Sequence, residues 1–177
     1  MQRPSQGFTL FELLITILLV SLLAGIAIPS FSASIARQRQ HTEIDALFHA
    51  IHLARKESIM RRKVVSLCPS LDGHSCADSR DWSSGWLMFE NKDRDSPPRI
   101  DAGEPILTRH KVGENIIISA NRKGFTLRAT FLRATNGTFV FCDPQNRISP
   151  MALVVSYTGR PRVARRKTNR NLYSCAD

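Results

Sequence analysis

Basic residues cluster near the C-terminus, in the stretch TGRPRVARRKTNRN that runs from Thr158 to Asn171. The stretch holds six Arg or Lys side chains and no acidic one: Arg160, Arg162, Arg165, Arg166, Lys167 and Arg170. Guanidinium groups bind phosphate oxygens through paired hydrogen bonds and keep their charge at any physiological pH. These residue types therefore indicate a surface that binds an anionic group, a phosphate above all.

The backbone of this stretch is restricted by Pro161, which disfavours helical geometry at Arg160. We therefore expect an extended chain from Gly159 to Val163. In an extended chain Arg160 and Arg162 lie on the same side, about 6–7 Å apart, a separation comparable to that of neighbouring phosphates along a nucleic-acid strand.

The charge of the whole chain is unevenly distributed. The formal net charge is +10, and residues 144–177 hold seven of the 25 basic residues but one of the 15 acidic residues. This asymmetry indicates an anionic partner, either nucleic acid or an acidic membrane surface. The alternative is a basic segment that keeps a terminal loop solvated or pairs with acidic groups of a neighbouring molecule.

No sequence pattern indicates catalysis. The chain has no G-x-S-x-G, Walker loop, H-E-x-x-H or dinucleotide fingerprint, so we expect neither an enzyme nor a cofactor. Asn91, Asp93 and Asp95 alternate as at the start of a calcium loop, but Ser96 and Ala102 stand where such a loop needs Gly and Glu. We therefore expect no metal site.

The N-terminal part is apolar enough to span a membrane. Residues 8–28, FTLFELLITILLVSLLAGIAI, hold one charge, Glu12, and as a helix they would be about 30 Å long. A cleaved secretory signal is the alternative, but a carboxylate inside the apolar run is costly unless it is paired. Helical periodicity also continues beyond Pro29, with apolar residues on one face: Ile35, Ile44, Leu47, Phe48, Ile51, Ala54 and Ile59.

The remainder of the chain predicts β-structure. After a strand that begins at Val64, short apolar runs are separated by Gly, Pro, Asp and Asn: residues 85–90, 105–112, 115–120, 124–131 and 151–157. Asn136-Gly137 between apolar alternations predicts a hairpin turn. Trp82 and Trp86 offer rings that could stack on bases, although at least one should be core. The fold class is α+β, a long N-terminal helix, transmembrane in its first half, packed on an antiparallel sheet.

The sequence QGFTLFELL, Gln6 to Leu14, closely resembles the processing site of type IV pilins and type II secretion pseudopilins. The matching features are a short basic leader ending in Gly7, then Phe8, then Glu12 as the fifth residue of the processed chain. The resemblance implies a pilin-like fold, cleavage by a prepilin peptidase between Gly7 and Phe8, and methylation of the new amine. It also implies a single-pass inner-membrane anchor, followed by assembly with other pilins into an extracellular pilus that crosses the periplasm. In the filament, the Phe8 amine of an adjoining subunit would neutralise Glu12.

This resemblance divides the chain into a leader (1–7), a transmembrane half-helix (8–30), an amphipathic half-helix (31–63) and a β-rich globular domain (64–177). The last of these contains the basic segment 158–171. Export favours disulfides among the four cysteines. Three pairings are open, and we expect Cys68–Cys76 and Cys142–Cys175. The second bridge would turn the basic segment into a closed loop, which lowers the entropy lost on binding.

The stretches CPSLDGHSC, DWSSGWLMFE and TGRPR are similar to minor pilins and pseudopilins of the GspH/FimT group. GRPR matches the G-R-x-R pattern of FimT-type minor pilins, which bind DNA during natural transformation. The match bears directly on Gly159, Arg160 and Arg162, and the later cations match in character only. Further basic residues would widen the surface if their strands lie adjacent: Arg122, Lys123, Arg128 and Arg133.

The resemblance thus implies a minor type IV pilin that binds extracellular double-stranded DNA through its basic segment. Two alternatives share the anchor and the expected fold. One is a structural minor pilin that primes assembly at the pilus tip, and the other is a minor pseudopilin of a type II secretion system.

Overall fold

The computed structural model describes residues 9–129 and 134–175, apart from the side chains of residues 26–29. The chain divides into two compact units, residues 1–35 and residues 36–177. One helix, α1 (Leu10–Arg61), contributes to both units.

The first unit consists of the apolar beginning of α1. Thr9 Oγ1 accepts a hydrogen bond from the Glu12 backbone N–H at 3.2 Å, and the Glu12 carboxylate accepts one from the Thr9 N–H at 3.0 Å. This reciprocal pair is a capping box. Large apolar side chains are exposed along the helix, among them Leu10, Phe11 and Leu23. Within the described residues, α1 is the one helix long and apolar enough to cross a membrane.

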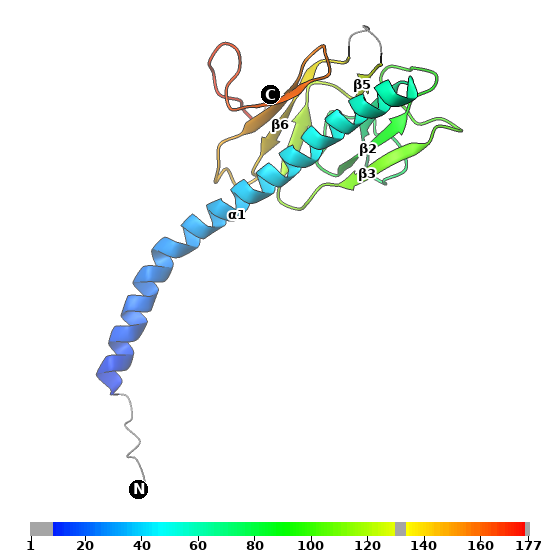
Figure 1. Cartoon of the computed structure of the whole chain (residues 1–177). Helices are drawn as coiled ribbons and strands as arrows, with labels where there is room; N and C mark the ends of the chain where they lie inside the picture. Colours follow the sequence, from blue (N-terminus) through cyan, green and yellow to red (C-terminus); the bar gives the residue numbers. More distant parts are fainter. Residues whose placement is uncertain (1–8, 130–133, 176–177) are drawn as a thin grey trace. The chain divides into compact units, whose positions relative to one another are not determined.

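The part of α1 that belongs to the globular unit carries one buried face, which lies on the strands (Figure 1). Its buried apolar residues recur at helical spacing: Ala36, Ile44, Leu47, Ala50, Ile51 and Ala54. The expected amphipathic face is confirmed from Ile44 to Ala54. Ile35 and Ile59 were expected on the same face but are exposed, because the buried face passes through the adjacent positions Ala36 and Ser58.

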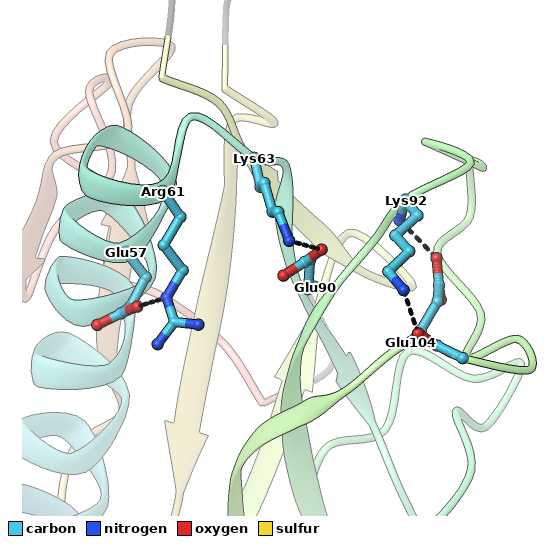
Figure 2. A network of polar contacts seen from close by, with 7 residues as sticks. Glu57, Arg61, Lys63, Glu90, Lys92 and Glu104 are labelled. Atoms are coloured by element: carbon cyan, nitrogen blue, oxygen red, sulfur yellow. Dashed lines mark hydrogen bonds and ion pairs between the residues drawn. The ribbon is translucent and has the colours of Figure 1, made fainter.

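The helix ends at Arg61, and Arg62 adopts a left-handed conformation with φ 55°. Two basic residues at this end have acidic partners (Figure 2). Arg61 pairs with Glu57, and Lys63 pairs with the buried Glu90 at 2.6 Å. The second pair ties the segment after the helix to the end of β2 (Gly85–Glu90).

The strands of the described residues form two four-stranded antiparallel sheets, whereas the sequence predicted one. The first sheet has the order β3-β2-β1-β5, built from β1 (Val65–Pro69), β2, β3 (Ile106–Lys111) and β5 (Phe125–Leu127). The second has the order β4-β6-β7-β8, built from β4 (Ile117–Ala120), β6 (Gly137–Cys142), β7 (Met151–Val155) and β8 (Pro161–Ala164). Each predicted run contains a strand. The expected fold class, a long helix packed on antiparallel β-structure, is confirmed. The strands divide between two sheets because β5 pairs with β1 while β6 pairs with β4 and β7.

The core lies between α1 and the inner faces of the strands. Trp82 is fully buried and packs edge-on against Phe125 of β5 and Phe139 of β6, with ring centroids 5.9 and 4.9 Å away. Trp86 is 3% exposed and stacks on His110 at 4.9 Å. Both tryptophans are core residues, so the suggestion that they stack on bases is wrong.

The hairpin expected at Asn136-Gly137 does not form. Gly137 is the first residue of β6 and pairs with Val155 of β7. A Cβ at Gly137 would lie 2.8 Å from the ring of Phe125 and 2.6 Å from Oδ1 of Asn121. Glycine is required here because side chains approach the backbone closely, a different requirement from the positive φ of a hairpin turn.

Candidate anion-binding surface

The first part of the basic segment is a tight hairpin between β7 and β8. The Ser156 N–H donates to the Arg160 carbonyl at 3.1 Å, the Gly159 N–H donates to the Ser156 carbonyl at 2.9 Å, and Gly159 has φ 70°. This is a three-residue loop with its third residue in the left-handed region. The expected extended chain therefore does not include Gly159. A Cβ there would also lie 2.9 Å from Cδ2 of Leu127, so conformation and space both require glycine.

Arg160 and Arg162 flank Pro161 at the start of β8, which is the last strand in the order of its sheet (Figure 1). Pro161 is buried and both arginines are exposed. Arg162 stands opposite Val154 of β7. Alternate residues of a strand lie on one face, so the two guanidinium groups share the solvent-facing side of this sheet edge.

The later part of the segment folds into a second hairpin, which the sequence analysis missed. Arg166 forms an isolated bridge with Leu172, and the Lys167 N–H donates to the Asn171 carbonyl at 2.8 Å. Arg170 occupies the third loop position with φ 66°, where the first hairpin has glycine. The Asn and Thr residues around the tip were the available turn signal. The segment is therefore folded over its length.

Both expected disulfides are present. Cys68–Cys76 closes a loop after β1, and Cys142–Cys175 joins the end of β6 to the end of the second hairpin, across 33 residues. The second bridge fixes the two hairpins to the sheet at their far end.

The arginines of the two hairpins lack acidic partners within the part of the chain that the structure describes. No carboxylate there lies within 4.0 Å of the guanidinium groups of Arg160, Arg162, Arg165, Arg166 and Arg170. Some basic residues elsewhere differ. Lys63 pairs with Glu90, and the Lys92 ammonium donates to the carbonyl of Gly103 (Figure 2). The two C-terminal hairpins thus hold five arginines whose positive charge has no ion-pair partner among the described residues.

The residues that were expected to widen this surface are arranged differently. Arg122 and Lys123 precede β5, which lies in the first sheet, whereas β8 lies in the second. The condition of adjacent strands is therefore not met. Lys123 pairs with Asp78 at 2.8 Å, and Arg122 donates to a backbone carbonyl at 3.2 Å. Arg128 is half-buried, and Arg133 lies outside the described residues.

A cleft of about 560 Å³ borders the second hairpin. Arg165 and Arg166 line it on the hairpin side, and Arg37 and His41 of α1 line it on the helix side. Sequence reasoning missed the two helix residues because they lie more than a hundred positions from the basic segment. The available signal was the basic stretch ARQRQH at the start of the amphipathic half-helix.

The floor of the cleft is held by hydrogen bonds. Gln40 is buried and donates from Nε2 to the carbonyls of Phe141 at 2.9 Å and Ser149 at 3.2 Å. Arg147, also on the lining, pairs with the buried Asp143. Hydrogen bonds from the Arg147 side chain outweigh the effect of burial and hold the pKa of the Asp143 carboxyl below its ordinary value. The positive charge of Arg147 is thereby compensated by Asp143, whereas Arg37, Arg165 and Arg166 have no ion-pair partner among the described residues.

The remaining candidate residues take other positions. Gly7 and Phe8 of the expected processing site lie outside the described residues, and Glu12 takes part in the capping box. Asp93 and Asp95 lie with Asp101 in a group whose carboxylate oxygens are within 4.8 Å of one another. Acidic groups of this kind are common on surfaces, and we assign it no function.

Two parts of the chain match known protein families. The model of the type II transport protein GspH matches residues 43–159, and the model of the prokaryotic N-terminal methylation motif matches residues 2–28. No curated protein matches the chain.

Solved structures share the fold at low sequence identity. The type IV minor pilin FimU of Pseudomonas aeruginosa is 18% identical, with a TM-score of 0.54 over 72% of this chain and 90% of that chain. The minor pseudopilin EpsH from the type 2 secretion system of Vibrio cholerae is 9% identical, with a TM-score of 0.51 over 71% of this chain and 96% of that chain. GspH of E. coli is 13% identical, with a TM-score of 0.50 over 73% and 89%. With the fold, the processing motif and the family match in agreement, the chain belongs to the GspH family of minor pilins and pseudopilins.

Proposed function

We propose that this chain is a minor type IV pilin that binds extracellular double-stranded DNA without sequence preference, for uptake in natural transformation. The proposed contacts are the cations of the two hairpins: Arg160, Arg162, Arg165, Arg166, Lys167 and Arg170. The observation that carries the proposal is the set of five arginines on two hairpins that a disulfide ties to β6, with no carboxylate of the described residues at ion-pair distance.

The mechanism is electrostatic. Each guanidinium group that contacts a phosphate releases condensed counterions, so affinity falls steeply with salt and is indifferent to sequence. Arg160 and Arg162 share one side of β8 at the spacing of an extended chain, about 6–7 Å, which suits successive phosphates. Because the hairpins are already folded, little conformational entropy is lost on binding.

A helix residue extends this surface beyond the basic segment. A Cβ at Gly159 would lie 3.9 Å from Cδ of Arg55, so the side chain of Arg55 lies beside the first hairpin. Arg55 is half-buried, as expected for an arginine whose stem packs while its head stays in water. We propose it as a further phosphate contact.

The proposed route begins at the membrane. A prepilin peptidase cuts between Gly7 and Phe8, the chain remains in the inner membrane through α1, and it then enters a pilus with other pilins. Glu12 exchanges its contact with the Thr9 N–H for the methylated Phe8 amine of an adjoining subunit. Weak affinity of each subunit for DNA suits this route, because retraction must deliver DNA and then release it.

The alternative is a structural minor pilin of the pilus tip or a minor pseudopilin of a type II secretion system. The match to the type II transport protein GspH and the likeness to EpsH favour it. In that case the basic hairpins would contact an acidic face of a neighbouring subunit, and DNA would not bind.

A gel-shift titration of the full chain in neutral detergent, with unrelated duplexes at several salt concentrations, tests the proposal. We expect equal binding of all duplexes and a log–log salt slope of roughly −0.9 per phosphate neutralised. Arg160→Gln with Arg162→Gln should reduce the slope by about 1.8 and leave the thermal midpoint unchanged.

The matched control is Arg94→Gln with Lys111→Gln. It also removes two exposed cations from the globular unit, but outside the two hairpins and at the side of the first sheet. An equal loss of affinity in both double variants, or no shift of any duplex at low salt, would favour the structural alternative.

A further inference from the structure

We propose that the cleft between α1 and the second hairpin binds the phosphate group of an anionic phospholipid while the chain is anchored in the membrane. The occupant is a lipid headgroup with a net negative charge, such as phosphatidylglycerol. This site is separate from the β8 arginines, although it shares Arg165 and Arg166 with the proposed DNA surface. It depends on the membrane anchor and does not depend on DNA binding.

The charge of the cleft fits one phosphate anion. Arg37 from α1 and Arg165 and Arg166 from the second hairpin supply positive charge from two sides, and no Asp or Glu of the described residues lines the cleft. The remaining arginine of the lining, Arg147, is already neutralised by Asp143. Guanidinium groups on two walls can bind two or more oxygens of one phosphate.

The walls are fixed before any ligand binds. Gln40 holds β6 and the loop after it against the helix, through the carbonyls of Phe141 and Ser149. On the other wall, Arg166 Nη1 donates to the Arg170 carbonyl at 3.2 Å, which orients the Arg166 guanidinium, and the Cys142–Cys175 disulfide closes the segment. A preformed site loses little ordering entropy when it binds an anion.

The position of Arg37 in the chain favours a lipid phosphate over other phosphate groups as the ligand of the cleft. The apolar unit ends at Ile35, and Arg37 follows within the same helix two residues later. From Leu10 to Ile35 the helix rises about 39 Å at 1.5 Å per residue, whereas the hydrocarbon core is about 30 Å thick. The apolar unit is therefore long enough to bring the residues that follow it, Arg37 among them, to the headgroup layer.

The apolar part of the lining points to the same ligand. Leu172 lines the cleft beside the arginines and is 59% exposed, and Met151 and Pro150 also line it. An exposed leucine next to guanidinium groups suits a membrane interface, where apolar side chains enter the acyl boundary and cations meet phosphates. A surface that binds only duplex phosphates has no need of this leucine.

Native mass spectrometry of the full chain tests the proposal, in neutral detergent with equal amounts of phosphatidylglycerol and phosphatidylcholine. We expect the wild type to retain phosphatidylglycerol in preference to phosphatidylcholine. Arg37→Gln with Arg165→Gln should weaken this retention about fivefold for each charge removed. Neither side chain makes a hydrogen bond within the described structure, so the fold should be unaffected, and the thermal midpoint checks this. The matched control, Arg160→Gln with Arg162→Gln, removes the same charge from β8 and should retain the lipid as the wild type does.

Four results would overturn the inference. The first is equal retention of the two lipids, and the second is equal loss in the cleft and control variants. The third is displacement of the lipid by an excess of inorganic phosphate, which would make the cleft a free-phosphate site. A cleft variant that loses DNA binding but retains the lipid would also count against it, since the cleft would then belong to the DNA surface. Failure of the gel shift alone concerns the proposed function and leaves this measurement unaffected.

Discussion

Glu43 of α1 and His110 of β3 form a hydrogen-bonded pair at the junction of the helix and the first sheet. Glu43 Oε2 lies 2.8 Å from His110 Nε2, and Glu43 Oε1 accepts a hydrogen bond from the Gly113 N–H at 3.0 Å. Burial of Glu43 raises the pKa of its carboxyl, but the hydrogen bonds from His110 and Gly113 outweigh burial and hold this pKa below its ordinary value. The ionised Glu43 therefore stabilises the docking of the helix.

The Glu43–His110 pair predicts how stability depends on pH. A carboxyl with a lower pKa in the folded state stabilises the fold above its unfolded pKa, about 4.3, and this contribution is lost as the pH falls through the folded pKa. We expect the free energy of unfolding to fall below about pH 4, and to fall less in Glu43→Gln, because the glutamine does not titrate. Urea unfolding, followed by tryptophan fluorescence at a series of pH values, measures this.

His110→Gln provides the second arm of this test. It removes the hydrogen bond that lowers the Glu43 pKa, so the acid-induced loss of stability contributed by this carboxyl should shrink as in Glu43→Gln. Profiles of both variants that parallel the wild type would exclude the pair as a determinant of acid stability.

Arg170 adopts a left-handed backbone conformation. The equivalent position of the first hairpin is occupied by a glycine, Gly159. A non-glycine residue there costs about 1 kcal/mol. Arg170→Gly should therefore raise the free energy of unfolding by about that amount, while removal of one phosphate contact reduces the salt slope of DNA binding by about 0.9. Urea unfolding and gel shift measure the two effects separately.

Arg170→Gly should raise stability but weaken DNA binding, so the structural effect of this residue can be separated from its effect on binding. Arg170→Gln is the control, because it keeps the conformational cost and removes the charge. It should lower the salt slope as Arg170→Gly does without raising stability. DNA binding by Arg170→Gly that equals the wild type would remove Arg170 from the proposed surface.

The Cys142–Cys175 bridge closes 33 residues that include both basic hairpins. Cys142→Ser with Cys175→Ser should lower the free energy of unfolding by about 3–4 kcal/mol, on the chain-entropy account. DNA affinity should fall several-fold at an unchanged salt slope, because the number of phosphate contacts is kept while the entropy lost on binding increases. A duplex titration of the oxidised wild type and the double variant, at several salt concentrations, checks the affinity and the slope, and urea unfolding checks the stability. The double variant Cys68→Ser with Cys76→Ser is the control, and an equal loss of DNA affinity in it would argue against a role of the tether.

Local patterns predicted the parts of this fold that depend on neighbouring residues. The face from Ile44 to Ala54 follows helical spacing, and the strand at residues 85–90 follows apolar composition and flanking turn residues. The hairpin prediction at Asn136-Gly137 was wrong because the sequence shows a glycine but does not show why it is needed. Either a positive φ or the close approach of a distant ring can require glycine. The pairing of β5 with β1, and of β6 with β4, likewise joins residues far apart in the sequence, as do the contacts of Trp82 with Phe125 and Phe139.

The candidate site also has a part that the sequence predicts and a part that depends on long-range contacts. The cations of the basic segment are a feature of composition and were visible in the sequence. The cleft is formed because Gln40 binds the Phe141 and Ser149 carbonyls, which brings Arg37 near the second hairpin. Such long-range contacts leave no periodicity in the sequence, so Arg37 and His41 could not be assigned to the site.

Gly159 offers a test of geometry that leaves every charge in place. Gly159 has φ 70°, which strains an alanine, and a Cβ added to it would lie 2.9 Å from Leu127 Cδ2, so we expect Gly159→Ala to shift the first hairpin against Leu127. Arg160 and Arg162 would lose their common alignment, so DNA affinity and the salt slope should both fall although the net charge is unchanged. Gly73→Ala is the matched control, since Gly73 has φ 73° but nothing within 4 Å of a Cβ, and it lies in the loop closed by Cys68–Cys76. The two variants should lose similar amounts of stability from backbone strain, about 1 kcal/mol, and only Gly159→Ala should weaken the gel shift. Equal DNA binding by both would mean that the arginines act through charge alone, whatever their arrangement on β8.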